Sequence, residues 1–263
     1  MKFTIHAGHN PDGKKACGAI GLIKESTENR KVKDEVMRLL KLKGHTVYDC
    51  TVDNGTGVAD IVNKQVEKMN SYSNIDLHIS IHFNSGASDK QGNGKTTGTE
   101  VLVYNTNGSK YEAAKRICSK IEKLGYKNRG VKTRTNLGVL KNSKGQALLV
   151  ECCFVDDKDD IALYDYKTMA KAIAEGILNE SIVENTSTST NSDNTYVVDC
   201  DTLNVRYGRG TEYEVAGKLK RGDKVEIWSI DKDRKGDDWG SFRYSFNPDI
   251  IGYVSKAYLE EVK

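Results

Sequence analysis

The sequence predicts an α/β domain, then a linker and a small all-β domain. Within residues 1–181, short segments of strand periodicity alternate with amphipathic helical segments. The segment Ala147–Phe154 (ALLVECCF) is almost continuously apolar, which is typical of a strand covered on both faces. We therefore expect a mixed, largely parallel twisted sheet flanked by helices. In residues 196–263, short alternating segments separated by glycine turns predict a small all-β barrel.

The chain opens with a β-α-β unit. Lys2–Ile5 has strand character, and a helix is expected to begin at Glu25 and end at Gly44, because glycine commonly terminates helices. His45–Asp49 is the next predicted strand, so a right-handed crossover is favoured. The apolar face of this helix recurs at helical spacing: Val32, Val36, Leu39 and Leu40.

The remaining elements follow from the same periodicities. Further strands are predicted at Ile75–Ser85, Glu100–Tyr104, Gly138–Leu140 and Ala147–Phe154, and helices at Val58–Met69, Lys110–Leu124, Asp156–Tyr164 and Tyr166–Leu178. The polar, glycine-rich segment Ala87–Thr97 is expected to be a mobile loop. Residues 182–195 are a Ser/Thr/Asn tract without the apolar residues needed to fold, and we expect a flexible linker there.

Composition narrows the class of protein. The chain has 263 residues, 37% of them hydrophobic, and a formal net charge of +3, too small to indicate nucleic-acid binding. No apolar run reaches the length that spans a bilayer, and Met1–Asn10 does not resemble a signal peptide. We therefore expect a protein without a membrane anchor that is made in the cytoplasm. The cysteines form no C-x-x-C pair and are expected to be free thiols: Cys17, Cys50, Cys118, Cys152, Cys153 and Cys200.

The segment Ile75–Ser85 (IDLHISIHFNS) alternates strictly, so one face carries apolar residues and the other carries His78 and His82. A single histidine more often satisfies a hydrogen bond than binds a metal. Other segments supply further donors: His9 follows the first strand, and Glu25 begins a helix. Two imidazoles and a carboxylate are a common zinc ligand set, with a fourth position left for water.

Glu151 interrupts the apolar strand Ala147–Phe154. A buried carboxyl group is unfavourable unless it has a partner or a function. A carboxylate beside a hydrolytic metal site can take a proton from water. Residue chemistry alone leaves the metal site open as an interpretation, because the ligands are too far apart in sequence for any spacing rule.

The segments that carry this chemistry also form a family pattern. They are Ile5–Asn10 (IHAGHN), Glu25 with Asn29, Ser80–Asn84 (SIHFN) and Leu149–Phe154 (LVECCF), the last followed by an acidic stretch. In this order and spacing, residues 1–181 resemble the zinc-dependent N-acetylmuramoyl-L-alanine amidases of bacterial autolysins and phage endolysins.

The resemblance implies that His9, Glu25 and His82 bind Zn²⁺ and that Glu151 is the catalytic acid/base. Asn84, the last residue of the S-x-H-x-N motif, is expected to bind substrate.

Three further residues lie in or near these motifs and have other expected roles. His6 stands where many relatives have an aspartate, so it is either a supporting residue or a bystander. Glu28 is the rival of Glu25, which we prefer because Asn29 lies four residues after it. His78 matches no family position, and a structural hydrogen bond is its expected role.

The predicted all-β domain, 196–263, also resembles a known family. Leu203–Tyr213 (LNVRYGRGTEY), Gly222–Val225 and Gly252–Leu259 are similar to a bacterial SH3-like domain, with Arg209 where the family usually has proline. Such domains hold wall hydrolases on peptidoglycan, which raises the local substrate concentration. We therefore expect 196–263 to be a cell-wall-binding domain.

These resemblances imply a peptidoglycan hydrolase that cleaves the amide between N-acetylmuramic acid and L-alanine. Two alternatives stay open: a zinc peptidase of the stem peptide, and a non-catalytic wall-binding protein. A lytic enzyme without a signal peptide also implies an endolysin that depends on a holin for release.

Overall fold

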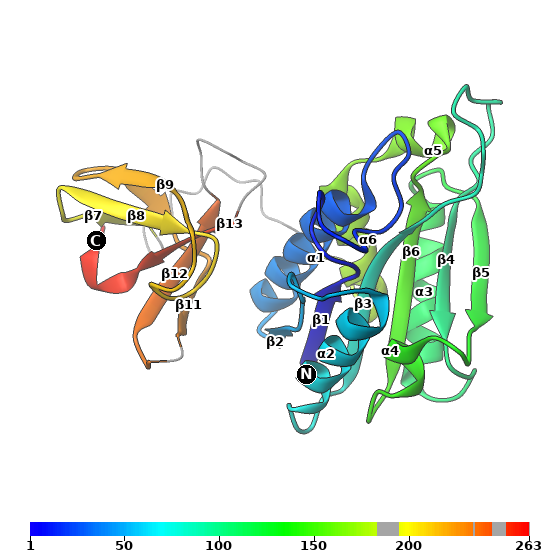
Figure 1. Cartoon of the computed structure of the whole chain (residues 1–263), viewed down its shortest axis with the longest axis horizontal. Coiled ribbons are helices and arrows are strands. Elements are labelled where there is room, and N and C mark those ends of the chain that lie inside the picture. Colours follow the sequence, from blue (N-terminus) through cyan, green and yellow to red (C-terminus); the bar gives the residue numbers. More distant parts are fainter. Residues whose placement is uncertain (183–194, 234, 244–250, 263) are drawn as a thin grey trace. The chain divides into compact units, whose positions relative to one another are not determined.

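A computed structural model describes residues 1–182, 195–233, 235–243 and 251–262 (Figure 1). The chain forms two compact units, Met1–Val183 and Glu184–Lys263. Residues 183–194 of the predicted linker lie outside the described residues. None of the helices in the described part of the chain is long and apolar enough to span a membrane.

A six-stranded sheet forms the centre of the first unit, with strand order β2-β1-β3-β6-β4-β5. Its strands are β1 (Lys2–Ala7), β2 (Thr46–Asp49), β3 (Leu77–Asn84), β4 (Thr99–Val103), β5 (Asn128–Thr133) and β6 (Ala147–Phe154). The pair β4–β6 is antiparallel, and every other neighbouring pair is parallel. The expected mixed, largely parallel sheet is therefore confirmed.

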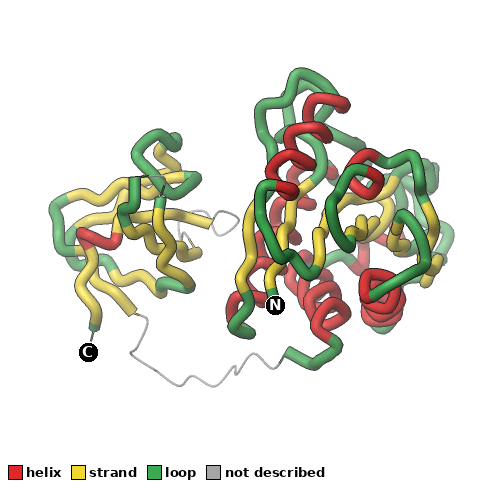
Figure 2. Tube along the Cα trace, turned by 90° about the horizontal axis from the view of Figure 1, so that it is seen from below, coloured by secondary structure: helices red, strands yellow, loops and turns green. Residues whose placement is uncertain are grey.

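Helices cover both faces of this sheet (Figures 1 and 2). They are α1 (Glu25–Leu42), α2 (Val58–Asn70), α3 (Ser109–Glu122), α4 (Gly138–Lys141), α5 (Lys158–Leu163) and α6 (Tyr166–Leu178). One face packs with α1, α3 and α6 around the main hydrophobic core. The opposite face packs with α2 and α4 around a smaller core that contains Met69, Val139 and Leu149. The second face also carries the polar residues considered below.

One local prediction was wrong, and one strand was missed. The segment Gly138–Leu140 was expected to be extended, but it forms the short helix α4, which turns Val139 and Leu140 into the smaller core. Four residues are too few for periodicity to separate a helical turn from a strand. Strand β5 was not predicted, because the sequence NRGVKT has little apolar content, as suits a strand at the edge of the sheet.

The second unit consists of two antiparallel sheets. β7 (Thr195–Val198), β10 (Lys224–Glu226) and β14 (Leu259–Glu261) form the smaller sheet. The larger sheet contains β8 (Thr202–Arg206), β9 (Val215–Lys220), β11 (Ser229–Lys232), β12 (Asp238–Arg243) and β13 (Ile251–Ser255). Buried side chains from both sheets, among them Val205, Val225 and Val254, make one core. The cysteines of the chain are free, as expected.

Candidate metal centre

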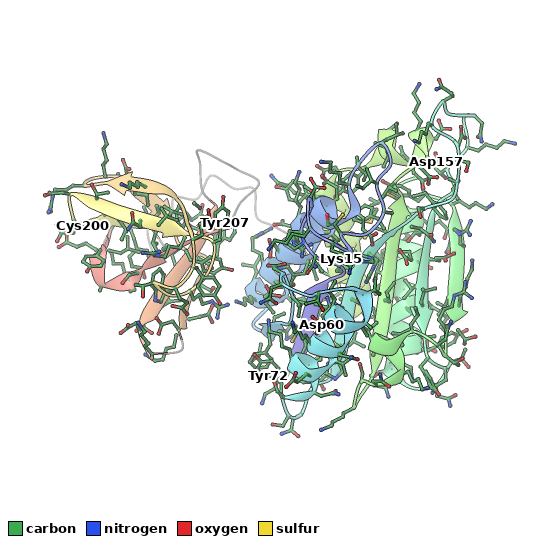
Figure 3. The ribbon with its side chains drawn as sticks, in the orientation of Figure 1. Lys15, Asp60, Tyr72, Asp157, Cys200 and Tyr207 are labelled. Atoms are coloured by element: carbon green, nitrogen blue, oxygen red, sulfur yellow. The ribbon has the colours of Figure 1, made fainter. Side chains whose placement is uncertain are left out.

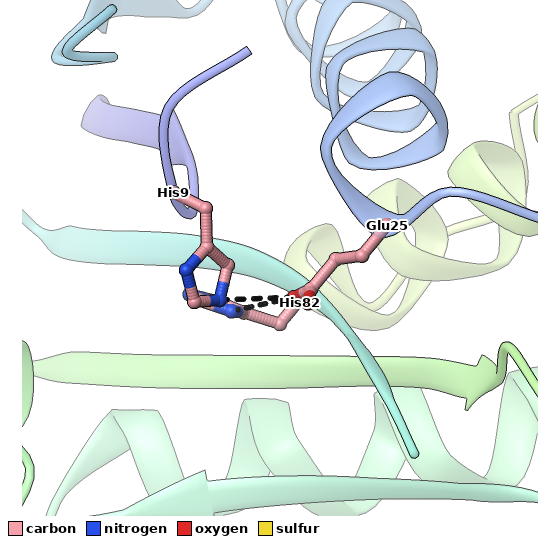
Figure 4. A group of neighbouring side chains, drawn as sticks. All are labelled: His9, Glu25 and His82. Carbon is pink, nitrogen blue, oxygen red and sulfur yellow. Dashed lines mark hydrogen bonds and ion pairs between the residues drawn. The ribbon is translucent and has the colours of Figure 1, made fainter. Parts of the chain in front are cut away.

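Three side chains that lie far apart in sequence meet at the ends of β1 and β3 and at the start of α1. One donor atom from each of His9, Glu25 and His82 lies within 4.8 Å of the other two. Glu25 Oε1 is 3.0 Å from His82 Nδ1 and 3.4 Å from His9 Nε2 (Figure 4). A carboxylate and two imidazole nitrogens therefore converge on one point, as hydrolytic zinc sites require.

Helix α1 holds the turn that carries His9. Asn29 Nδ2 donates to the carbonyl oxygen of Gly8 at 2.9 Å, and Arg30 Nη2 donates to that of His9 at 3.0 Å. His9 itself has a φ of 66°, in the left-handed region. These two hydrogen bonds keep the strained turn in place. Asn29 thus supports the site by holding Gly8. Among the described residues, its side chain bonds to Gly8 and Arg30 and makes no hydrogen bond to the Glu25 carboxylate.

Glu25 is 3% exposed, and both of its oxygens have donors. Oε2 accepts from the backbone N–H of Ala19 at 2.8 Å, and Oε1 accepts from that of Phe83 at 3.2 Å. Burial raises the pKa of this carboxyl group, but hydrogen bonds and charges from His82 and His9 outweigh it and hold the pKa well below its usual range. Glu25 is therefore an anion placed to bind a cation.

Glu28, the rival candidate, contacts other groups. Tyr164 Oη donates to its Oε2 at 3.1 Å, and Lys31 Nζ lies 3.3 Å from its Oε1. Glu28 does not belong to the donor cluster of the described residues. The choice of Glu25 over Glu28 therefore agrees with the geometry.

The imidazole of His82 packs directly over the backbone of Gly8. A Cβ atom added at Gly8 would lie 2.0 Å from His82 Cε1 and 2.3 Å from Nε2, closer than any real contact. Only glycine leaves room for the ring at this position. The glycine before His9 thus has a steric reason in addition to the turn.

Glu151 lies on β6 directly beside His82 on β3 and Glu100 on β4. Its Oε2 atom is buried and has no hydrogen-bond partner among the described residues. Burial, with smaller contributions from the charges of Glu25 and Glu100, raises the pKa of Glu151 to about 8. This carboxyl group can therefore change its protonation state near neutral pH, as a general acid/base must.

Glu100 is a residue that sequence reasoning missed. It is 4% exposed, and its Oε2 accepts from Arg129 Nε at 2.7 Å and Lys132 Nζ at 2.6 Å. Asn84 Nδ2 donates to Oε1 at 3.2 Å, so Glu100 orients the Asn84 amide. The sequence feature that could have identified Glu100 is a carboxylate within the apolar strand TEVLV, the same feature that identified Glu151.

His6 and His78 do not belong to the donor cluster of the described residues. His78 Nδ1 lies 2.7 Å from Thr4 Oγ1, the structural hydrogen bond that was expected. His6 is fully buried, and burial lowers its pKa to about 3, so the ring is neutral. Its Nε2 atom has no partner among the described residues. His6 therefore packs behind the site without joining the donor set.

The donor cluster borders a cavity of about 380 Å³, which His9 and His82 line. His9, His82, Asn84, Glu100 and Glu151 line one part of it. Helices α2 and α4 supply a mostly apolar wall on the opposite side. A substrate in this cavity would meet the donor cluster and Glu151 together.

The segment expected to be a mobile loop is tied down by the acidic stretch after β6. Asp156 accepts from the backbone N–H groups of 86–88, Asp159 from those of 93–95, and Asp160 from that of Gly98. Asp157, labelled in Figure 3, is fully buried and accepts from Thr97 N and Oγ1. The acidic stretch therefore anchors this loop beside the end of β3.

Comparisons with known proteins agree with this architecture. The N-acetylmuramoyl-L-alanine amidase family model matches residues 4–180, and the bacterial SH3 domain model matches residues 201–260. An uncharacterised protein of Clostridium perfringens is 31% identical over 239 residues, which cover 86% of this chain and 68% of that protein. The endolysin of Bacillus phage SPP1 is 28% identical over 179 residues, 65% of this chain and 61% of the endolysin.

Solved structures show the same likeness. The catalytic domain of the CD27L endolysin, which targets Clostridia difficile, is 30% identical with a TM-score of 0.61, covering 70% of this chain and 99% of that domain. The amidase AmiC2 of Nostoc punctiforme is 26% identical with a TM-score of 0.55, covering 68% of this chain and 96% of that one. The chain therefore belongs to the N-acetylmuramoyl-L-alanine amidase family, as a peptidoglycan amidase that carries a bacterial SH3 domain.

Proposed function

We propose that this amidase is zinc-dependent and that His9, Glu25 and His82 are the zinc ligands. The donor set supports this assignment, because two imidazole nitrogens and an anionic carboxylate meet within 4.8 Å of one another. Zinc is favoured over magnesium or calcium, which prefer oxygen ligands. When bound, zinc would act as a Lewis acid that polarises the scissile carbonyl and lowers the pKa of water.

Glu151 is the general base and then the general acid of this reaction. It takes a proton from the attacking water and delivers it to the amine of L-alanine as the amide breaks. A pKa raised to about 8 suits the second step, because the protonated carboxyl group is then available near neutral pH. The single observation that carries this role is the buried, unpartnered Oε2 of Glu151 beside His82.

Asn84 binds the substrate in this proposal. Its Nδ2 already donates to Glu100, and its Oδ1 accepts from the backbone N–H of Ser85 at 2.9 Å. These two bonds set the orientation of the amide, which lines the cavity.

The SH3 unit holds the enzyme on the wall. Joining a wall-binding module to the amidase in one chain raises the effective concentration of the scissile bond without any new catalytic contact. The domain boundaries 1–181 and 196–263, the linker between them and release through a holin remain predictions.

The experiment compares purified cell walls before and after incubation with the wild type and with Glu151→Ala and His82→Ala. The wild type should expose new L-alanine amino groups without releasing reducing sugar. Glu151→Ala should keep one equivalent of zinc by elemental analysis and lose hydrolysis, whereas His82→Ala should lose both. A Glu151→Ala protein that still lyses walls would refute its role.

A further inference from the structure

The cavity beside the metal centre carries a cation that the proposed mechanism does not use. Arg134 lines this cavity together with Glu100 and Glu151. Its side chain is exposed and has no hydrogen-bond or ion-pair partner among the described residues. An arginine without a partner beside two carboxylates of the same cavity is available to a ligand.

Neighbouring cations are already paired. Arg129 and Lys132 of β5 both donate to Glu100, at 2.7 and 2.6 Å. Glu100 therefore offsets part of the positive charge of these two side chains. Arg134 follows them on the same edge of the sheet, and it is the one lysine or arginine among the described residues that line the cavity.

The register of the sheet gives the distance between Arg134 and the reacting groups. The backbone N–H of Arg134 donates to the carbonyl oxygen of Val103 at 2.9 Å. Val103 follows Glu100 by three residues on β4, and Glu100 pairs with Glu151. At about 3.3 Å per residue and about 4.8 Å between neighbouring strands, the backbone of Arg134 lies about 11 Å from Glu100 and about 14 Å from Glu151. Its long side chain reaches back to the cavity that Glu151 also lines.

The opposite wall is apolar. It is formed by Val58, Ile61 and Val62 of α2 and by Leu137 and Val139 around α4. These five side chains carry no charge, so the part of the ligand that lies against this wall should be uncharged. A small apolar residue fits this wall, with an anionic group farther along at Arg134.

We propose that Arg134 binds a carboxylate of the peptide arm of the substrate, on the residue that follows L-alanine. This assignment rests on the proposed amide hydrolysis. In the substrate of an N-acetylmuramoyl-L-alanine amidase, the carboxyl group of the muramoyl unit is consumed in the scissile amide, so the glycan side carries no charge at this point. An anion beside the cut therefore belongs to the peptide. A cavity of about 380 Å³ also suits a short peptide better than a continuous glycan strand.

The test uses the zinc-loaded full chain on two preparations of the same walls. In one, free carboxylates are converted to amides with carbodiimide and ammonia; the other is untreated. The variants are Arg134→Gln, Arg134→Lys and the control Lys141→Gln, which removes an exposed charge from α4 outside the cavity. Rates are measured as the release of L-alanine amino groups, and circular dichroism and zinc content verify that each variant is folded and loaded.

The wild type and Lys141→Gln should cleave untreated walls about tenfold faster than amidated walls, the size expected for one charge-assisted hydrogen bond. Arg134→Gln should cleave both at the slow rate, and Arg134→Lys should keep part of the preference. Because amidation changes wall binding by the SH3 unit equally for every variant, the ratio of the two rates isolates Arg134.

Two results would overturn the proposal in different ways. If Arg134→Gln keeps the wild-type preference for untreated walls, or if the wild type has no preference while releasing L-alanine amino groups, the carboxylate site is wrong and the amidase function stands. If the wild type, loaded with zinc, releases no L-alanine amino groups from untreated walls, the proposed function fails and the carboxylate site fails with it.

Discussion

The buried carboxyl group of Glu151 makes the stability of the amidase unit depend on pH in a way that a single substitution should remove. Its pKa is about 8 in the folded protein, against an ordinary value of 4.5. Between these values the folded state holds a proton that the unfolded state has lost, so stability falls as pH rises from 4.5 to 8 and stays low above 8. Glu151→Gln has nearly the same shape and cannot ionise.

The size of the effect follows from the same two values. At about 1.36 kcal/mol for each pH unit, the full difference is at most about 5 kcal/mol. In the metal-free protein, the free energy of unfolding of Glu151→Gln should therefore be higher than that of the wild type. The difference should be about 1 kcal/mol at pH 5 and up to about 5 kcal/mol at pH 9. A bound cation favours the ionised carboxylate, so zinc should shrink the difference.

Urea unfolding at both pH values measures this directly. The α-helices of the described residues all lie in 25–178, so circular dichroism at the helical band follows the amidase unit. Both tryptophans, Trp228 and Trp239, lie in the SH3 unit, so their fluorescence is an internal control that Glu151→Gln should not alter. Glu112→Gln, at an exposed site on α3, serves as the matched variant.

The reasoning is refuted if Glu151→Gln changes stability by the same amount at pH 5 and pH 9, or if it is less stable than the wild type at pH 9. Either result would mean that Glu151 is ionised and well solvated in the folded protein.

Two further substitutions test the packing around the centre. Gly8→Ala should weaken zinc binding at least tenfold in a competitive chelator titration, because its Cβ would lie 2.0 Å from the ring of His82. The control is Gly57→Ala, which should bind zinc like the wild type because a Cβ there meets nothing within 4 Å. Asp157→Ala should destabilise the amidase unit by about 2–4 kcal/mol in urea, because Asp157 caps α5 and accepts two hydrogen bonds from Thr97. Limited proteolysis should then cut within residues 86–98, and an uncut loop would contradict the anchoring role.

Much of the fold followed from periodicity. Helices α1, α2, α3 and α6 and the strands β1, β3 and β6 were predicted within a few residues, because each carries several apolar side chains at its own repeat. Strand β5 and helix α4 were not predicted. The edge strand β5 is too polar, and the four-residue helix α4 is too short, to show a periodic pattern of apolar residues. Their conformation is set by neighbours, as at Gly138, where an added Cβ atom would lie 2.5 Å from Val62 Cγ1.

The candidate site was likewise predicted in part from the sequence and decided in part by the fold. Residue types and motif order pointed to His9, Glu25, His82 and Glu151, because these chemistries are unusual in their local settings. The sequence preferred Glu25 over Glu28 only for its spacing to Asn29. The fold shows which of the two reaches His82, 57 residues away. Local sequence records what a segment prefers, whereas a contact across the sheet depends on register and on which helix covers which face.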